Sequence, residues 1–419
     1  MLDLKFIREN ADKVRVNILN KNESANMELV IETDEKRRSI IQEVEQLKNQ
    51  RNTVTNEIAV LKKNKEDASE KIEAMKVVSD RIKALDDELR EADDQLRDQL
   101  LRIPNMVHSS VPVGKTADDN VEVRRWGTLN MNQTANHVEI SKELGILDFE
   151  RGAKVSGSGF CYYIGKGAAL ERALINFMLE KQTTQNGYTE LMTPLIVNPN
   201  SMLGTGQLPK MEEDMYFAEK DNLYLIPTAE VPITNFYNGE MLKVEDLPIK
   251  FCGYTPCFRR EAGSYGKETR GFLRVHQFNK VELVKFTLPE SSYDELELLT
   301  ADAESILKAL EIPYRVIQLC SGDTSFSSAK TYDIEVWSPG EQKWLEASSC
   351  SNFEDFQARR ANIRFKRTPA DKPEFVHTLN GSGMATSRLI VALIENYYED
   401  GRIRVPEALR PYTKFDYIG

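Results

Sequence analysis

The chain has 419 residues, enough for two or three domains, and a formal net charge of −11 at pH 7. That charge argues against a protein that coats nucleic acid, because binding along phosphates requires positive charge, although a local basic patch is compatible with it. The five cysteines and four histidines are scattered, so we expect neither a disulfide framework nor a zinc site. No apolar run reaches ~18 residues and no targeting pattern opens the chain, so we expect no membrane span and a cytoplasmic location.

Residues 1–102 have the pattern of a helical domain. Residues 1–20 predict a short amphipathic helix, and in residues 28–100 apolar residues recur at alternating intervals of four and three along two stretches. This predicts two helices of about 30 residues, each about 45 Å long, that fold back on each other as an antiparallel coiled-coil arm. Two helices of a bundle and a dimerisation coil are the alternatives. Basic residues toward the tip form a candidate stripe: Lys48, Arg51, Lys62, Lys63 and Lys65.

Residues 103–127 hold prolines and a glycine without a helical period, which predicts a linker, and residues 128–419 have the texture of a second domain. We expect a hairpin at 152–164, helices at 170–181, 293–310 and 385–398, and strands at 190–197, 223–227, 274–286, 314–319, 332–337 and 344–351. Because strands come in runs rather than alternating with helices, the pattern predicts an α+β domain with a mainly antiparallel sheet.

The run at 258–282 is the most informative segment. Two arginines and Glu261 precede a polar, glycine-rich loop, and Arg274, Phe278 and Glu282 follow at intervals of four. An even interval on an extended strand places side chains on one face, and arginine pairs bidentately with phosphate. The run therefore predicts a nucleotide site with a pocket for a small cationic group at Glu282. A charged strand face exposed to solvent is the alternative.

Three further segments are weak signals when taken alone. Residues 381–390 form a Gly/Ser segment entering a predicted helix, where free backbone N–H groups and Arg388 could hold an anion. Glu346 and Ser349 offer the oxygen ligands that a magnesium–triphosphate site needs. Residues 228–230 place a carboxylate at a strand end. Neither a P-loop nor a G-x-G-x-x-G motif occurs, so the expected nucleotide site belongs to neither common type.

Together these segments resemble the bacterial-type seryl-tRNA synthetases, a family of class II aminoacyl-tRNA synthetases, from end to end of the chain. The family's helical arm matches residues 1–100, motif 1 matches about 172–197, motif 2 is 258–282 and motif 3 is 378–396. The stretches TAE and EASSCSN match its serine and ATP elements. One small departure is Arg260, where many relatives carry serine. The resemblance implies a class II antiparallel sheet flanked by helices and a homodimer formed through motif 1.

The resemblance also implies the site residues. Those for ATP are Arg259, Arg260, Glu261, Val275, Phe278, Glu346, Ala347, Ser348, Ser349 and Arg388, with Glu346 and Ser349 as ligands of Mg²⁺; those for serine are Thr228, Ala229, Glu230, Glu282 and Ser382; and those acting in catalysis are Arg259, Arg274 and Arg388. Arg259 would grip the α-phosphate and Arg388 the γ-phosphate, while Glu261 and Phe278 would hold the adenine. Arg274 would assist near the serine carboxylate or the phosphates.

The implied activity is that of a serine–tRNA ligase. It would form seryl-adenylate from L-serine and ATP and transfer serine to the 3′ end of tRNA(Ser), and of tRNA(Sec) where present. Two alternatives are a paralogue that charges a carrier protein and a non-catalytic coiled-coil interaction protein. The intact arm argues against the first, and the retained set of site residues argues against the second.

Overall fold

The computed structural model describes residues 1–262 and 271–419. The chain folds into two compact units. A helical unit comprises Leu2–Leu19 and Glu23–Pro104, and a sheet unit comprises Met1, Asn20–Asn22 and Asn105–Gly419. None of the helices among the described residues combines the length and the apolar composition that crossing a membrane requires.

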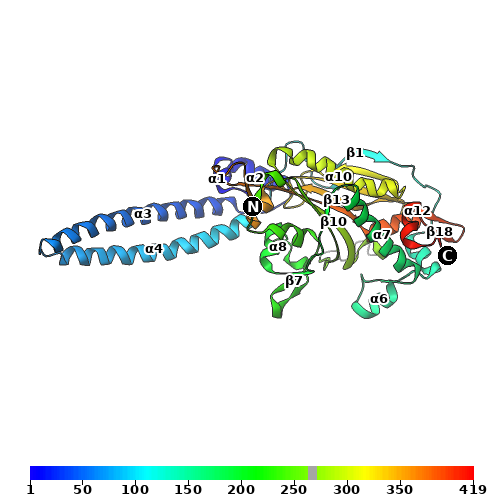
Figure 1. The fold of residues 1–419 in the computed structure, drawn as a ribbon, viewed down its shortest axis with the longest axis horizontal. Coiled ribbons are helices and arrows are strands. Elements are labelled where there is room, and N and C mark those ends of the chain that lie inside the picture. The colour runs from blue at the N-terminus through cyan, green and yellow to red at the C-terminus, as the bar shows by residue number, and fades with distance from the viewer. Residues whose placement is uncertain (263–270) are drawn as a thin grey trace. The chain divides into compact units, whose positions relative to one another are not determined.

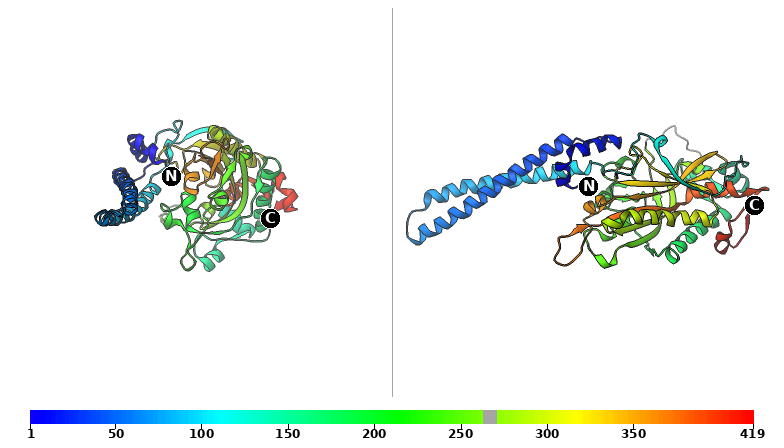
Figure 2. Two further views of the ribbon diagram at one scale, coloured as in Figure 1. Left: turned by 60° about the vertical axis from the view of Figure 1, so that its left-hand side comes forward. Right: turned by 90° about the horizontal axis from the view of Figure 1, so that it is seen from above.

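The helical unit contains α1 (Leu4–Glu9), α2 (Ala11–Asn20), α3 (Met27–Lys63) and α4 (Ser69–Leu101). The single helix predicted for 1–20 is thus two helices, which meet at Asn10. Helices α3 and α4 run side by side in opposite directions (Figures 1 and 2). Their narrow seam buries Ile40, Val44 and Leu85. The predicted antiparallel arm is confirmed, and both of its helices exceed the expected length.

The sheet unit is built on one eight-stranded sheet with the strand order β1-β11-β12-β13-β16-β10-β9-β4. Its strands are β1 (Val121–Trp126), β4 (Thr189–Glu190), β9 (Ile249–Phe258), β10 (Gln277–Thr287), β11 (Tyr314–Gln318), β12 (Lys330–Ser338), β13 (Lys343–Asn352) and β16 (His377–Ala385). Neighbouring strands are antiparallel, except that β4 runs parallel to β9. This is the α+β architecture with an antiparallel sheet that the sequence predicted.

Helices α7 (Lys166–Thr184), α10 (Ser292–Ala309) and α12 (Thr386–Tyr397) cover one face of this sheet. Apolar side chains from these helices share one buried core with Val281 and Leu283 of β10. Because side chains alternate along a strand, Phe278, Lys280 and Glu282 point to the opposite face. That second face carries the candidate site.

Smaller elements complete the sheet unit. They are α5 (His137–Leu144), β2 (Leu147–Asp148), α6 (Phe149–Ser156), β3 (Tyr162–Tyr163), β5 (Ile196–Val197), α8 (Pro199–Thr205), β6 (Phe217–Ala218), β7 (Leu223–Leu225), α9 (Glu230–Thr234), β8 (Met241–Lys243), α11 (Phe356–Ala361), β14 (Arg364–Lys366), β15 (Glu374–Phe375), β17 (Tyr398–Glu399), β18 (Arg402–Arg404), α13 (Arg410–Thr413) and β19 (Tyr417–Ile418). Short 3-10 helices join several of them, and η6 (Gly271–Leu273) lies beside the candidate site.

Several predicted elements are wrong in detail. The expected linker 103–127 contains β1, which pairs with β11 at one edge of the sheet. The expected hairpin 152–164 is absent: its first five residues end helix α6, and its later residues include β3, which pairs with β2. Residues 190–197 contribute to two short strands in different sheets. Strand β10 begins at Gln277, so Arg274 lies before the strand.

The Gly/Ser segment at 381–390 differs most from its prediction. Residues 381–385 belong to β16, where Ser382 is paired with Glu282 of β10 and Gly381 with Cys350 of β13. The backbone N–H groups of this stretch therefore lie within a central strand, and the segment is not the open anion-binding turn that its composition predicted. What remains of that hypothesis is Arg388, which lies in the first turn of α12.

Candidate active site

A cavity of about 560 Å³ lies over the central strands of the sheet. Its walls come from β10, β13, β16 and the residues that follow β9, so segments far apart in the sequence meet there. The predicted site residues that line it are Thr228, Glu230, Arg259, Glu261, Arg274, Val275, Phe278, Glu282, Glu346, Ala347, Ser349, Ser382 and Arg388. The tertiary fold thus brings the four predicted segments into one site.

Three predicted residues do not line this cavity. Ala229 is fully buried in a separate apolar cluster. The Arg260 side chain is exposed, and its backbone N–H donates to the carbonyl oxygen of Asp214. The Ser348 hydroxyl donates to the carbonyl oxygen of Ser382 at 2.5 Å, which ties β13 to β16. Residues 263–270 of the motif 2 segment lie outside the described residues.

One group of side chains in the cavity combines two carboxylates with a lysine. Thr228 donates to Glu282 Oε2 at 3.2 Å, and Lys280 donates to the Thr228 hydroxyl at 2.9 Å and forms an ion pair with Glu282. Glu230 accepts a hydrogen bond of 2.6 Å from Gln357 Nε2. These polar side chains are buried. Water therefore competes little for their hydrogen bonds, and a small ligand of matching charge would be bound directly by the protein.

Burial perturbs Glu230 strongly. Loss of solvent and the neighbouring Glu282 carboxylate raise the pKa of Glu230 to about 7, against an opposing effect of the Gln357 hydrogen bond and of Lys280 and Arg259. A cation bound beside the two carboxylates would relieve this repulsion. The pocket is therefore suited to an ammonium group.

A second group of lining residues contains two arginines and an aromatic ring. The Arg259 guanidinium lies 5.2 Å from the centre of the Phe278 ring, and Arg259 Nε donates to the carbonyl oxygen of Pro227. Arg274 Nη1 donates to Glu261 Oε2 at 2.7 Å. The aromatic ring can stack on a base, and the arginine side chains can neutralise phosphate.

The third group lies at β13. Arg388 Nη1 donates to the backbone oxygen of Glu346 at 2.7 Å and lies 3.4 Å from its carboxylate. Asp333 faces Ser349 across β12 and β13, and its Oδ1 is a buried oxygen without a hydrogen-bond partner. Burial and the nearby Glu346 carboxylate raise the pKa of Asp333 well above its ordinary range. This set of oxygen donors with excess negative charge fits a hard divalent cation such as Mg²⁺.

Sequence reasoning missed Lys280, Asn380 and Gln357, which line or support the cavity. Lys280 was within reach, because the even spacing that places Phe278 and Glu282 on one face includes it. Asn380 could not be predicted to face the cavity before β16 was known to be a strand. Gln357 lies on α11, far from the motifs in the sequence, and only the fold brings it beside Glu230.

Comparison with known proteins identifies the family. The model of the seryl-tRNA synthetase N-terminal domain matches residues 1–107, and that of the tRNA synthetase class II core domain (G, H, P, S and T) matches residues 212–397. A serine–tRNA ligase of Chloroherpeton thalassium is 56% identical over 427 residues and is covered, like this chain, to 100%. The chain belongs to the seryl-tRNA synthetase family. The predicted family, class II fold and enzyme class of a serine-specific tRNA ligase are confirmed.

Solved members of the seryl-tRNA synthetase family share the architecture. The seryl-tRNA synthetase from Pyrococcus horikoshii, solved in complex with ATP, superposes with a TM-score of 0.95 at 38% identity, over 100% of this chain and 99% of that one. The cytoplasmic serine–tRNA ligase from Naegleria fowleri, solved with AMP, gives 0.88 at 29% identity, over 100% and 98%.

Proposed function

We propose that this chain activates L-serine with ATP and transfers the seryl group to the 3′ end of tRNA(Ser), with the cavity as the place of both reactions. The observation that carries the proposal is that arginines, an aromatic ring, oxygen donors and two buried carboxylates all face one cavity of about 560 Å³. ATP and a small amino acid need these groups together.

Positioning and charge neutralisation account for the first reaction. The ammonium group of serine lies beside Glu230 and Glu282, which leaves its carboxylate free to attack the α-phosphorus of ATP. A bond forms between a carboxylate oxygen and that phosphorus while the bond to the β-phosphate breaks, and pyrophosphate leaves. Arg259 stabilises the charge that develops on the α-phosphate, and Phe278 and Glu261 hold the adenine.

The flanking groups hold the rest of ATP. Arg388 binds the γ-phosphate, and Arg274 assists near the serine carboxylate or the phosphates. Glu346 and Ser349 would hold Mg²⁺, which supplies positive charge to the phosphate oxygens when bound. In the second reaction the terminal hydroxyl of tRNA attacks the seryl carbonyl carbon, and AMP leaves.

Specificity for serine follows from the polar pocket. Thr228, Glu282 and Ser382 present groups that can bond the serine hydroxyl or ammonium, and Lys280 fixes Thr228 and Glu282 in place. Alanine lacks the hydroxyl and would leave buried polar groups unpaired, which costs about 10⁴-fold in comparable sites.

The tRNA would be held in part by the arm. The match of residues 1–107 to the family's N-terminal domain supports this role, and Lys62, Lys63 and Lys65 are exposed where α3 turns back. Local phosphate contacts of this kind are compatible with an acidic chain. We further propose that the protein charges tRNA(Sec) where that tRNA is present and that it forms a homodimer through α7. We also propose that it acts in the cytoplasm, the compartment named for the Naegleria fowleri relative.

The test is ATP–pyrophosphate exchange with each amino acid, followed by charging of total tRNA. Serine-dependent exchange and charging of tRNA(Ser) are expected. Exchange without charging would favour the carrier-protein paralogue, and no exchange with any amino acid would leave a non-catalytic interaction protein.

Arg259→Ala should lower kcat/KM for exchange by about 10²–10³-fold, because it removes a preorganised charge at the developing transition state. Arg151→Ala is the matched control, since Arg151 is an exposed arginine on α6 paired with Asp148. Unchanged melting temperatures would show that both variants fold. Exchange at the wild-type rate in Arg259→Ala would remove this residue from the site.

A further inference from the structure

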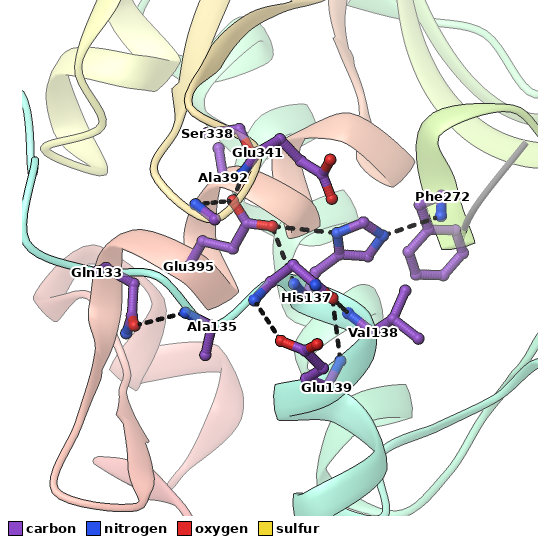
Figure 3. A network of polar contacts seen from close by, with 12 residues as sticks. Gln133, Ala135, His137, Val138, Glu139, Phe272, Ser338, Glu341, Ala392 and Glu395 are labelled. Atoms are coloured by element: carbon purple, nitrogen blue, oxygen red, sulfur yellow. Dashed lines mark hydrogen bonds and ion pairs between the residues drawn. The ribbon is translucent and has the colours of Figure 1, made fainter. Parts of the chain in front are cut away.

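His137, the first residue of α5, makes two side-chain hydrogen bonds in a buried network (Figure 3). Its ring Nδ1 lies 3.1 Å from Glu395 Oε1, and its Nε2 lies 3.2 Å from the backbone nitrogen of Phe272. A backbone N–H can only donate, so Nε2 is the acceptor and the ring proton sits on Nδ1, facing the carboxylate. The imidazole therefore bridges Glu395 of α12 and Phe272 of η6.

Glu395 is held from every side. Its Oε1 also accepts from the His137 backbone N–H at 2.9 Å, and its Oε2 accepts from the Ser338 hydroxyl and from the Gly340 N–H at 3.0 Å. Neither His137 nor Glu395 has accessible surface. Four donors occupy the carboxylate, which fixes its position in the core.

A metal ion is the competing interpretation of this cluster. Among the described residues, His137, Glu341 and Glu395 place ligand atoms within 4.8 Å of one another. However, both nitrogens of His137 and both oxygens of Glu395 already have protein partners. Only one oxygen of Glu341 is buried without a partner, and one such oxygen does not make a metal centre. The bonds favour a positioning role.

The backbone beside His137 is shaped for this contact. Gly271 has φ of +59°, and a Cβ there would lie 2.2 Å from His137 Nε2, so a larger residue would displace the ring. The Phe272 side chain is buried, with its ring centre 5.1 Å from that of Phe149 and 5.4 Å from that of Tyr163. The backbone at Phe272, where motif 2 leads into β10, is thus held by one hydrogen bond to His137 and by ring contacts of Phe272 with Phe149 and Tyr163.

We infer that His137 and Glu395 are a positioning pair that joins the end of motif 2 to the motif 3 helix. Arg274 follows Phe272 by two residues, Arg388 precedes Glu395 by about two turns on α12, and both arginines line the cavity. The pair holds these two arginines at a fixed separation, which sets how both can reach the phosphates of one ATP. This inference rests on the proposed function for the identity of the ligand.

Two substitutions separate the two bonds of the ring. His137→Asn places an amide N–H near the position of Nδ1 and keeps the bond to Glu395 but loses the acceptor for Phe272. His137→Gln reaches to the position of Nε2 and keeps that acceptor, while residue 137 stays tied to Glu395 through its backbone N–H. His377→Asn is the matched control, because His377 bonds Ser292 and does not line the cavity.

We expect KM for ATP in serine-dependent exchange to rise about tenfold in His137→Asn, to return to within about twofold of wild type in His137→Gln, and to stay unchanged in His377→Asn. KM for serine should stay within about twofold in all three. Amide hydrogen exchange of the 271–276 segment should become faster in His137→Asn alone. A tenfold effect corresponds to about 1.4 kcal/mol, the scale of one hydrogen bond.

Other outcomes would overturn the inference. If His137→Asn lowers the melting temperature while KM for ATP and amide exchange at 271–276 stay as in wild type, the pair is merely structural. If His137→Asn does not fold, Gly271→Ala provides the same test, because its Cβ displaces the imidazole. An unchanged KM for ATP in Gly271→Ala would also overturn the inference. Failure of wild type to catalyse exchange would refute the proposed function instead. In that case ATP affinity by calorimetry and amide exchange at 271–276 still decide the inference.

Discussion

Glu230 and Glu282 occupy one buried pocket, and Lys280 forms an ion pair with Glu282. With Lys280 engaged there, loss of solvent and the charge of Glu282 together raise the pKa of Glu230 to about 7. The protonation of one side chain therefore changes near neutral pH at the place where the ammonium group of serine is proposed to bind. Burial thus moves the pKa of Glu230 into the range where small changes of pH alter its charge.

The affinity for serine should depend on pH through Glu230. Only the ionised carboxylate attracts an ammonium group, and the ionised fraction falls as pH drops through about 7. KM for serine in the exchange reaction should rise about tenfold between pH 8 and pH 6. Glu230→Gln should have a high KM without this dependence, whereas Glu240→Gln, at an exposed glutamate, should behave as wild type. A KM for serine that is flat with pH in the wild type would contradict the assignment.

Glu171 of α7 should make the folded protein less stable as pH rises. Burial raises its pKa to about 7, although Thr386 and Asn279 both donate to Oε1. Because the folded pKa lies above the unfolded value, the ionised form is disfavoured by folding and the free energy of unfolding falls as pH rises from about 4.5 to 7.

Glu171→Gln removes this penalty and keeps the accepting oxygen. It should raise the free energy of unfolding at pH 8 by about 1–3 kcal/mol and have little effect at pH 5. Urea denaturation at both pH values measures this, with Glu150→Gln, an exposed glutamate on α6, as the control. Equal effects of Glu171→Gln at pH 5 and pH 8 would show that its charge is not the cause.

At the scale of elements, strand β16 shows why composition misled the prediction. Glycine and serine are common in turns, yet β16 lies between β13 and β10 in the middle of the sheet. A Cβ at Gly381 would lie 2.3 Å from Leu299 Cδ2 and 2.9 Å from Cys350 Sγ. Glycine is required there because helix α10 packs directly onto the strand, and a close approach of this kind has no signature in the local sequence.

Gly381→Ala should therefore destabilise the sheet unit by about 1–3 kcal/mol through overpacking against α10. Leu299→Ala makes room for the new methyl group, so the double variant should lose less stability than the two single variants added together. A double-mutant cycle by urea denaturation measures this coupling. Strict additivity would mean that α10 does not press on β16 at this point.

Prediction succeeded for elements with a strong period and failed for short ones. The heptad pattern of residues 28–100 and the helices at 170–181, 293–310 and 385–398 were found because each repeats a signal over several turns. Strand β1 was missed because its side chains are largely exposed at an edge of the sheet, and α6 because it contains Gly152 and ends at Gly157. Such elements are held by neighbours that are distant in the sequence.

At the scale of the whole molecule, the two units should separate activation from charging. Replacing residues 35–97 by a short Gly/Ser linker should spare exchange and abolish charging of tRNA, because the deleted part of the arm is the proposed tRNA contact. The ends can be joined, since Gln99 Nε2 donates to Thr33 Oγ1 at 3.1 Å. Retained charging would show that the arm does not bind tRNA.

A charge variant refines the same test without a deletion. Changing Lys62, Lys63 and Lys65 together to alanine should weaken charging and lower its dependence on salt, since fewer phosphates are neutralised. Alanine at Lys36, Lys76 and Lys83 of the same helices is the matched control. Equal losses in both sets would assign the effect to net charge rather than to the tip. Lys48 is a weaker candidate, because it lies 3.4 Å from Asp86 of α4.

The sequence by itself determined the family, the arm and most of the residues that line the candidate site, because these depend on residue types at fixed spacings within single segments. Arg259, Glu261, Phe278 and Glu282 could be named from one run of residues. The tertiary structure decided what depends on approach between distant segments: the conversion of a Gly/Ser stretch into a central strand, the pairing of Lys280 with Glu282, and the tie from His137 to Glu395. Burial and packing are properties of the assembled chain, and a linear pattern carries no measure of them.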